Sequence, residues 1–329
     1  MTGDSVLVTG ARGFVGWHVA KQLLSVQARV RGLTRSLALP LPETDPGIRW
    51  FEGDITRPET LIEPLKDCRY LFHVAADYRF WAPQHRHIYE SNVSGTINAL
   101  DAAWKAGVEK VVYTGTCGIL AASHRGEGNE TKLVSSREVS GPYTHSKLLA
   151  YHEVQKRCKR GWPIVTVLPT SVIGPCDLRP TPTGRIIIEF LKGAFPMIAR
   201  TGLNFVDVRD VAAGHLLALD RGIVGQRYII GCQNLSLREF LARLERFGVH
   251  RVPKLVSPYL LSRIIAEVSE RAAKLNNREP LAAREAVKAS RHTSFFSSSK
   301  AIFQIGYQPN GIEHAIEDAV TFFRSKRMA

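Results

Sequence analysis

The sequence predicts an α/β protein with a doubly wound parallel sheet and a smaller, mainly helical C-terminal substrate lobe. Three observations predict this fold class. Short apolar runs alternate with helical stretches from residue 5 to about residue 175, a glycine pattern follows the first run directly, and the alternation breaks down from about residue 176. Strands that alternate with helices are typical of parallel sheets covered on both faces.

The alternating region contains six expected strands and three long expected helices. The strands fall at residues 5–10, 28–34, 48–54, 70–76, 110–116 and 163–170. The helices fall at residues 16–25, 89–107 and 143–159, and each is long enough for a right-handed crossover between parallel strands. The region is therefore predicted to be a Rossmann-type domain, in which ligands bind beyond the carboxyl ends of the strands.

The remainder of the chain is predicted to form a second lobe. Proline and glycine interrupt the pattern after residue 175, a helix is expected at 186–193 and a strand at 227–231, and residues 236–289 look mainly helical. We predict a cofactor-binding domain at residues 1–175, with a later segment of about 205–235 interleaved into it, and a substrate-binding lobe at residues 176–329.

The composition is that of a folded, water-soluble protein. Of 329 residues, 44% are hydrophobic and 22% are charged, and the five cysteines form no C-x-x-C pair. We expect free thiols, no resident metal and a cytoplasmic location. The first strand begins almost at Met1, which leaves no room for a signal peptide, and no run approaches the ~18 apolar residues of a membrane span.

The net charge of +14 is the unusual property of the composition. The basic residues are scattered and no nucleic-acid-binding pattern accompanies them, so we expect a solvated basic surface and no nucleic-acid partner. Residues 257–275 read as an amphipathic helix. A lid over the substrate pocket is the favoured interpretation of this helix, and peripheral contact with anionic lipid is the alternative.

A glycine pattern with the spacing G-x-x-G-x-x-G follows the first expected strand and opens a helix. Gly10 permits the tight turn, Gly13 lets the backbone approach a pyrophosphate, and Gly16 lets the helix pack against the strand. The helix N-terminus then presents unpaired N–H groups to the phosphates. The expected cofactor-binding residues of this loop are Gly10, Arg12, Gly13, Phe14, Val15 and Gly16.

The end of the second strand predicts which nicotinamide cofactor is bound. An NAD site usually places a carboxylate there for the ribose 2′-OH, but this chain reads Thr34-Arg35-Ser36. Arg35 can grip a 2′-phosphate with paired donors, and Arg12 adds positive charge. We therefore predict NADP(H), with NAD(H) as the alternative.

Two further strand ends are predicted to contact the cofactor. Asp54 follows the third strand, where it can accept a hydrogen bond from the adenine amino group, and Ile55 can pack on the ring. The fourth strand ends in the small residues Ala75 and Ala76, which would let the cofactor lie against the backbone.

Tyr143 and Lys147 are the candidate catalytic pair. Residues four apart are neighbours on a helix face, so the Lys147 ammonium is expected to lower the pKa of the Tyr143 phenol and to bind the nicotinamide ribose. The fifth strand ends in Thr114-Gly115-Thr116, at the sheet edge where catalytic groups gather. The Thr116 hydroxyl can there fix a carbonyl beside Tyr143 and share its developing charge.

These motifs, taken together, resemble the extended short-chain dehydrogenase/reductase family. The resemblance rests on TGxxGxxG, the HxAA strand end, SNVSGT, YxxxK and PTSVIGP, it spans residues 5 to about 235, and it has Asp210 as a later landmark. It implies that Tyr143 is the acid/base, that Lys147 assists it and that Thr116, where many relatives carry Ser, orients the substrate. It also implies a proton-relay role for Asn92 and a homodimer through the helices that carry Asn92 and Tyr143. By the same resemblance, further cofactor contacts are expected from Thr114, Pro169, Thr170 and Val172.

Within that family the chain is most similar to dihydroflavonol-4-reductase-like and 3β-hydroxysteroid-dehydrogenase-like proteins. The segments HVAADYRFWA and RPTPTGRIII resemble those of a hopanoid-associated group named as sugar epimerases. Nucleotide-sugar epimerases usually carry an arginine-bearing segment before the strand that contains Asp210, and here only Arg200 is available. The aromatic character of the expected pocket favours a hydrophobic substrate. The candidate substrate contacts are Asp77, Tyr78, Trp81 and Phe190.

Three functions compete on these residues. The first is an NADP(H)-dependent reductase or dehydrogenase that acts on a carbonyl of a hydrophobic or polycyclic molecule. The second is an NAD(P)-dependent nucleotide-sugar epimerase or dehydratase, and the third is a non-catalytic NADP-sensing protein on the same fold. The intact set of Thr116, Tyr143 and Lys147 disfavours the third.

Overall fold

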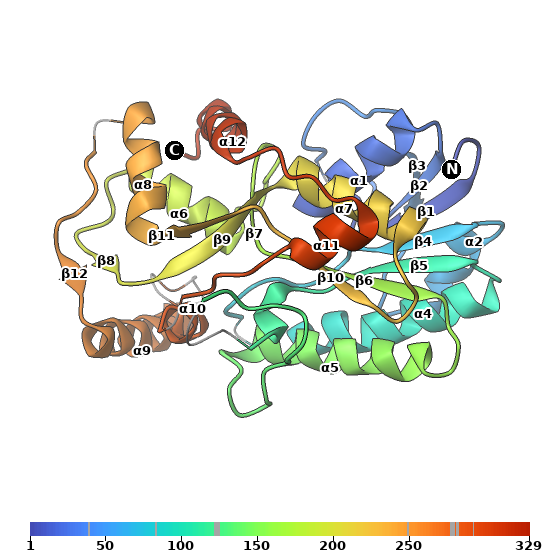
Figure 1. Ribbon diagram of the computed structural model, residues 1–329, viewed down its shortest axis with the longest axis horizontal. Helices are drawn as coiled ribbons and strands as arrows, with labels where there is room; N and C mark the ends of the chain where they lie inside the picture. Colours follow the sequence, from blue (N-terminus) through green and yellow to red (C-terminus); the bar gives the residue numbers. More distant parts are fainter. Residues whose placement is uncertain are drawn as a thin grey trace.

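The computed structural model describes most of the chain. The described residues are 1–38, 40–82, 84–121, 126–248, 250–276, 280, 283–291 and 293–329. Figure 1 shows a central twisted sheet with helices on both faces and a second group of elements beyond one end of it.

A seven-stranded parallel sheet forms the larger part of the protein, in the order β10-β6-β5-β4-β1-β2-β3. Its strands are β1 (Ser5–Thr9), β2 (Arg29–Thr34), β3 (Arg49–Glu52), β4 (Tyr70–His73), β5 (Lys110–Thr114), β6 (Ile164–Pro169) and β10 (Arg227–Ile230). The order reverses on the two sides of β1, so the carboxyl ends of β1 and β4 border a crevice. Such a reversal is where ligands bind in open α/β sheets.

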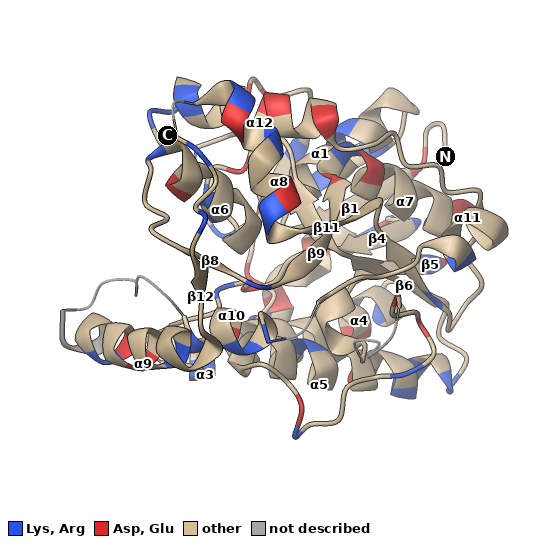
Figure 2. Ribbon diagram, turned by 60° about the vertical axis from the view of Figure 1, so that its left-hand side comes forward, with Lys and Arg blue, Asp and Glu red and all other residues tan. Residues whose placement is uncertain are grey.

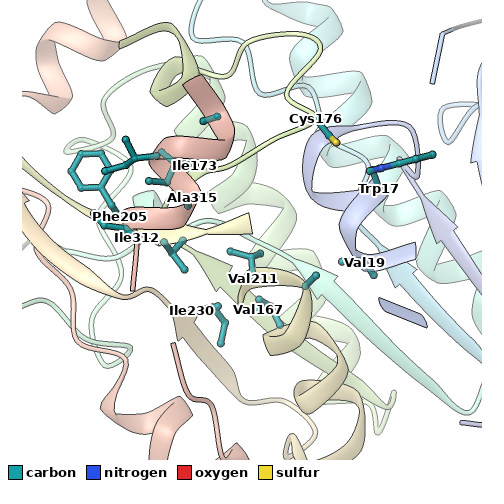
Figure 3. Packing of buried hydrophobic residues seen from close by; sticks show 14 of the residues in the cluster. Trp17, Val19, Val167, Ile173, Cys176, Phe205, Val211, Ile230, Ile312 and Ala315 are labelled. Carbon is teal, nitrogen blue, oxygen red and sulfur yellow. The ribbon is translucent and has the colours of Figure 1, made fainter. Parts of the chain in front are cut away.

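Helices cover both faces of this sheet because successive strand side chains point to opposite faces. Val6 and Val8 of β1 belong to one buried cluster, and Leu7 between them belongs to another. The first cluster includes side chains of α1 (Phe14–Ser25) and α7 (Val208–Arg221), such as Trp17 and Val211, which Figure 3 shows. The second includes side chains of α4 (Gly95–Lys105) and α5 (Pro142–Cys158).

The second group of elements contains helices and two small sheets. One sheet has the order β11-β9-β7 and the other pairs β12 with β8. The strands are β7 (Ser171–Ile173), β8 (Ile198–Ala199), β9 (Gly202–Asp207), β11 (Gln233–Ser236) and β12 (Val256–Ser257). The helices are α6 (Pro182–Leu191), α8 (Leu237–Leu244), α9 (Tyr259–Asn276), α10 (Arg284–Ala289) and α12 (Glu313–Ser325), whereas α11 (Ser299–Ile305) packs against α7 and β10 of the main sheet.

Short helical turns complete the chain. They are η1 (Pro58–Leu61), α2 (Ile62–Leu65), α3 (Arg86–Tyr89), η2 (Glu90–Ser94), η3 (Cys117–Ile119) and η4 (Glu245–Phe247). The helix predicted at 89–107 is therefore α3, η2 and α4 in succession, with a π-helical turn around Asn92.

The predicted doubly wound sheet is confirmed, with each of the six predicted strands in it. One detail of the prediction was wrong. The strand expected to contain Asp210 ends at Asp207, because the Asp207 carboxylate accepts a hydrogen bond from Arg209 N (2.8 Å) and caps α7, which leaves Asp210 in the first helical turn. The C-terminal lobe is mainly helical, as predicted, and it also contains the short strands β8, β9, β11 and β12. The division of the chain at residue 175 stays a prediction, although the segment after it returns α7 and β10 to the main sheet.

Candidate active site

The turn between β1 and α1 is shaped by its glycines. Gly10 has a positive φ of +69°, and a Cβ added to it would lie 2.8 Å from Ala75 Cα. A Cβ on Gly16 would lie 2.1 Å from the Gly10 carbonyl oxygen. The first turn of α1 has no acidic residue, and its N-cap Gly13 offers no side-chain cap. This narrow turn and its free N–H groups fit the pyrophosphate of a dinucleotide.

A buried hydrogen-bond network, which the sequence prediction missed, fixes the crevice beside this turn. Thr9 Oγ1 accepts from the backbone N–H groups of Val74 (3.1 Å) and Ala75 (3.2 Å) and lies 2.9 Å from His73 Nδ1. Burial lowers the pKa of His73 to about 3, so the ring is neutral. Thr96 uses its proton on Asn92 O, so His73 Nε2 donates to Thr96 Oγ1 (3.1 Å) and Nδ1 accepts from Thr9.

Two arginines and a carboxylate lie at the carboxyl ends of β2 and β3. The sequence prediction included the two arginines but not the carboxylate. Arg35 is exposed after β2, and the Arg12 guanidinium lies over the Trp50 ring (4.7 Å) and donates to Leu37 O (3.1 Å). Glu52 pairs in register with Thr34, and its carboxylate accepts from Leu37 N (3.4 Å). A carboxylate therefore does lie at this sheet edge, although on β3 rather than on β2.

The residues predicted to contact adenine lie next to each other after β3. The Asp54 carboxylate accepts from the Thr56 N–H and hydroxyl, both at 2.8 Å. Ile55 is buried, and a Cβ added to Gly95 of α4 would lie 2.6 Å from its Cδ1. Asp54 is thus held by its own loop and Ile55 packs against α4.

Lys147 is buried at the carboxyl end of β5. Its Nζ donates to the Thr114 carbonyl oxygen (2.7 Å) and lies 4.7 Å from the centre of the Tyr113 ring. Thr114 Oγ1 in turn lies 2.8 Å from His215 Nε2 of α7. Burial lowers the pKa of Lys147 to about 7, so small changes around the amine near neutral pH change its charge.

Tyr143 lies in the first turn of α5, and Thr116, which follows β5, is close enough to influence the pKa of its phenol. Thr116 Oγ1 accepts from Gly118 N (3.2 Å), and the Phe80 ring lies 5.7 Å from the Tyr143 ring. Lys147 was expected to lower the pKa of the Tyr143 phenol, but it is not among the protein groups that shift this pKa most. Burial raises the pKa of Tyr143, and the Thr116 side chain opposes that rise only in part.

Asn92 connects the helix that carries Tyr143 to the loop that follows β4. Its Oδ1 accepts from Asp77 N (2.7 Å), and its Nδ2 donates to Asp77 O (2.8 Å) and Ser146 Oγ (2.9 Å). Ser146 Oγ donates to Tyr143 O (2.7 Å), so Asn92 supports the backbone of the tyrosine. The proton-relay role expected for Asn92 stays a prediction.

The segment predicted to border the nicotinamide lies beside these groups on the sheet. Pro169 ends β6, which pairs with β5 at Thr114↔Val167. Thr170 N donates to Ile230 O (3.1 Å), and Val172 lies in β7. Three strand ends, those of β5, β6 and β10, therefore meet here.

The candidate substrate residues do not form one group. Asp77 and Arg79 form an ion pair (2.5 Å), and Tyr78 OH donates to Arg179 O (2.6 Å). Trp81 is 7% exposed, and its Nε1 has no hydrogen-bond partner among the described residues. Phe190 is 2% exposed and packs in the large core cluster with the ring of Phe205. This position suits a core residue better than a substrate contact.

A carboxylate from the C-terminal part completes the site and was missed by the sequence prediction. Glu285 of α10 accepts from Tyr143 N (3.1 Å), Thr144 N (2.9 Å) and Thr144 Oγ1 (2.8 Å). No local pattern signals this contact, because 141 residues separate Thr144 from Glu285.

Three other expectations concern sites outside this region. Over the described ranges, no three His, Cys, Asp or Glu side chains gather as metal ligands, and no helix is long and apolar enough to span a bilayer. Figure 2 shows basic and acidic residues interspersed along helices such as α9 and α12. In this view the basic residues do not gather on the face of a single helix.

Comparisons with known proteins agree with the geometry. The model described as the NAD dependent epimerase/dehydratase family matches residues 6–231. A Synechocystis protein with a provisional assignment as a dihydroflavonol 4-reductase is 38% identical over 98% of this chain and 95% of its own length. Sterol demethylase protein B of Methylococcus capsulatus is 28% identical over 98% of this chain and 99% of its own.

Solved structures share the fold over nearly the whole chain. The crystal structure of gox2253 has a TM-score of 0.87 and 38% identity, covering 98% of this chain and 99% of that one. PA4631, a nucleoside-diphosphate-sugar epimerase from Pseudomonas aeruginosa, has a TM-score of 0.81 and 19% identity, covering 99% of both chains. The second likeness is one of fold alone.

Proposed function

Because the chain belongs to the NAD dependent epimerase/dehydratase family of extended short-chain dehydrogenases/reductases, we propose that it is an NADP(H)-dependent reductase. It interconverts a ketone or aldehyde with an alcohol on a hydrophobic or polycyclic substrate. The observation that carries the proposal is the placement of Tyr143 beside Thr116 at the sheet edge, with the buried Lys147 one helical turn further on.

The cofactor residues are the glycine turn and the strand ends around it. Gly10, Gly13 and Gly16 hold the pyrophosphate at the start of α1, and Arg12 with Arg35 attracts a 2′-phosphate. When bound, the nicotinamide supplies or accepts the hydride. Lys147 binds the nicotinamide ribose, and Ala75, Ala76 and the segment from Pro169 to Val172 border the cofactor.

The protein's own groups handle the proton. In the reductive direction Tyr143 Oη donates its proton to the carbonyl oxygen, and in the oxidative direction it accepts the alcohol proton. Thr116 Oγ1 donates a hydrogen bond that orients the same oxygen. Lys147 stabilises the tyrosinate when its amine is charged, and Asn92 holds the backbone of Tyr143 through Ser146.

Two observations favour a hydrophobic substrate over a nucleotide sugar. Phe80 packs beside Tyr143, and Trp81 is close in sequence and largely buried. Arg200, the candidate for a diphosphate contact, lies exposed in the turn between β8 and β9. The names of the two relatives above refer to a dihydroflavonol and a sterol, which are polycyclic molecules.

A turnover screen tests the proposal. Consumption of NADPH is followed at its absorbance maximum with sterol ketones, flavonoid-like ketones, simple aldehydes and nucleotide sugars, each also with NADH. The proposal expects net NADPH oxidation with a polycyclic ketone. Epimerisation of a nucleotide sugar with no net redox change, by protein that retains its cofactor on purification, would instead establish the epimerase alternative.

A homodimer and a cytoplasmic location belong to the same proposal. The helices α3, α4 and α5 carry or adjoin Asn92 and Tyr143, and the exposed Trp104 of α4 stacks on Trp162 at 4.6 Å. The five cysteines are free thiols, which suits a reducing compartment. Sedimentation velocity checks the dimer, and a monomer at all concentrations would remove that part.

The helix α9 is proposed to be a lid over the substrate pocket. Its outer face exposes Leu260, Leu261, Ile264, Ile265 and Val268. The alternative, peripheral contact with anionic lipid, rests on the same face together with the exposed Arg263. Flotation with phosphatidylglycerol vesicles distinguishes them: a lid leaves the protein unbound, whereas lipid contact carries it upward and is lost in Ile264→Glu.

A further inference from the structure

The first turn of α5 is built to receive a carboxylate from elsewhere in the chain. Gly141, at the N-cap, offers no side-chain cap, and Pro142 at the first helical position has no N–H group. The next two N–H groups, those of Tyr143 and Thr144, donate to Glu285 at 3.1 and 2.9 Å. Because the first amides of a helix have no partner within it, Glu285 satisfies the groups that α5 itself leaves open.

The space for this carboxylate is provided by a glycine. Glu285 is 2% exposed, and a Cβ added to Gly141 would lie 2.5 Å from its Oε2. Any side chain at position 141 would therefore displace the carboxylate. The close fit indicates a defined contact rather than a surface residue that happens to reach the helix.

The same short helix ties the C-terminal part of the chain to the catalytic helix. Lys288 Nζ of α10 donates to Val139 O (2.6 Å), before the start of α5. Arg284 donates to the Glu270 carboxylate of α9 from its backbone N (2.7 Å) and its Nε (2.8 Å). In Figure 1, α9 and α10 lie at the end of the molecule where α5 begins. The position of α9 is thus linked through α10 to Tyr143.

We propose that Glu285 is a positioning residue for Tyr143, through which the C-terminal lobe fixes the first turn of α5 and keeps the phenol protonated as a donor for a carbonyl oxygen. This inference rests on the proposed reductase function. Burial raises the pKa of Glu285, and in its ionised form the carboxylate opposes a second negative charge on the phenol. It therefore favours the proton-donating form that carbonyl reduction requires.

Other titratable groups also surround the phenol: Cys117 and Asp77 act on its pKa in the same direction as Glu285, and Tyr113 of β5 lies nearby. Lys147 lies further along α5, and Cys117 follows Thr116 from the β5 side; Asp77 approaches from the loop after β4 but is paired with Arg79. Tyr89 of α3 lies near enough to Glu285 to interact with it electrostatically. Among the described residues Glu285 makes no ion pair, so its charge acts on the first turn of α5 without a neutralising partner, and it contributes to the raised pKa of Tyr143.

The test compares Glu285→Gln, which removes the charge, with Glu285→Asp, which keeps it. The matched control is Glu313→Gln, a carboxylate on α12 that is paired with Arg243 and Arg246 and lies outside the α9–α10 linkage. The readouts are the pH profiles of kcat/KM for reduction and oxidation, the Kd of NADPH, and amide hydrogen exchange in the first turn of α5 without added cofactor.

In Glu285→Gln we expect both pH profiles to shift downward by about one pH unit. Tyr143 and Thr144 amides should exchange at least about tenfold faster, because one cap acceptor becomes a donor. The Kd of NADPH should stay within about twofold of the wild type, since the residues proposed to bind the cofactor are untouched. Glu285→Asp should restore the pH profiles, and the control should match the wild type throughout.

Wild-type pH profiles and exchange rates in Glu285→Gln would overturn the proposal. An equal change in the control would also overturn it, because the effect would then be one of lobe stability. If the wild type turns over no carbonyl substrate, the proposed function fails, but the exchange comparison still decides whether Glu285 fixes the first turn. If Glu285→Gln does not fold, the test rests on Glu285→Asp. Faster amide exchange in the first turn of α5, together with wild-type pH profiles, then supports the inference. Unchanged exchange refutes it.

Discussion

Two helices begin at the carboxyl end of the same sheet, and their N-termini are completed in opposite ways. The helix α1 follows Gly13, with no side-chain cap and no acidic residue in its first turn. The helix α5 follows Gly141, and the carboxylate of Glu285 accepts from its first two N–H groups. A helix N-terminus favours negative charge in both cases. At α1 that preference is directed to a phosphate from outside the chain, and at α5 the chain supplies the anion itself.

The difference shows that similar local electrostatics can build a binding site or a support. At the α1 terminus, a side chain at Gly10 or Gly16 would collide with neighbouring backbone. The α5 terminus is surrounded by side chains from three parts of the chain, and it carries Tyr143. A ligand-binding turn must stay accessible, whereas a turn that holds a proton donor gains from being fixed.

Replacement of Tyr143 by Phe removes the group that the α5 terminus holds, and it has the largest expected effect. Loss of a general acid costs about 10²- to 10⁴-fold in rate, so kcat/KM for carbonyl reduction should fall by that factor. The Kd of NADPH, measured by fluorescence titration, should stay within about threefold because α1 is unaffected. A variant that kept more than about a tenth of the wild-type activity would contradict the acid/base role.

Replacement of Gly16 by Ala should damage the α1 terminus and leave the α5 terminus intact. The new Cβ would lie 2.1 Å from Gly10 O, so the turn must shift. We expect the affinity for NADPH to fall by about 100-fold, since misplacement by about 1 Å has effects of that size. The control is Gly248→Ala, whose Cβ finds its nearest neighbour at 3.4 Å. Equal NADPH affinities of the two variants would show that the turn does not hold the cofactor.

The same contrast explains what could be predicted from the sequence. The α1 terminus was predictable because its strand, glycines and helix occupy consecutive residues, and Tyr143 and Lys147 because helical neighbours are four residues apart. The contact of Glu285 was not, because its partners lie 141 and 142 residues earlier. Phe190 illustrates a different limit: an apolar side chain fits a pocket or a core equally well, and only the packing distinguishes them.

Arg35 tests how far the α1 site extends along the sheet. Arg35→Ala removes charge-assisted hydrogen bonds proposed for the 2′-phosphate, which contribute about 1.5–3 kcal/mol. We expect the Kd of NADPH to rise by about 10- to 100-fold and that of NADH to change little. Arg29→Ala is the control, because Arg29 is an exposed residue at the opposite end of β2. Equal loss for both cofactors would assign Arg35 a structural role instead.

The N-terminus of α6 is a third case for the comparison. Its expected effect is the smallest, and it is seen in how the stability of the protein changes with pH. The Asp177 carboxylate accepts from Thr181 N (2.8 Å) and Thr181 Oγ1 (2.9 Å), and Thr181 caps α6 through Gly184 N (3.1 Å). Like Glu285, Asp177 is buried beside a first turn, but its other oxygen, Oδ1, has no hydrogen-bond partner among the described residues. Burial raises the pKa of Asp177 to about 7, and burial also raises the pKa of Glu285.

The pH dependence of unfolding follows from the direction of that shift. Since the folded-state pKa lies above the unfolded value of 3.8, the folded state binds the proton more tightly, and the stability that this gives is lost as the pH rises from about 4 to about 7. Asp177→Asn cannot ionise and avoids this loss. Relative to the wild type, the variant should gain about 1–2 kcal/mol in free energy of unfolding between pH 5 and pH 8, measured by urea denaturation. A difference that stays constant with pH would mean that Asp177 is ionised at both values, and that its two hydrogen bonds from Thr181 outweigh the cost of burying the charge.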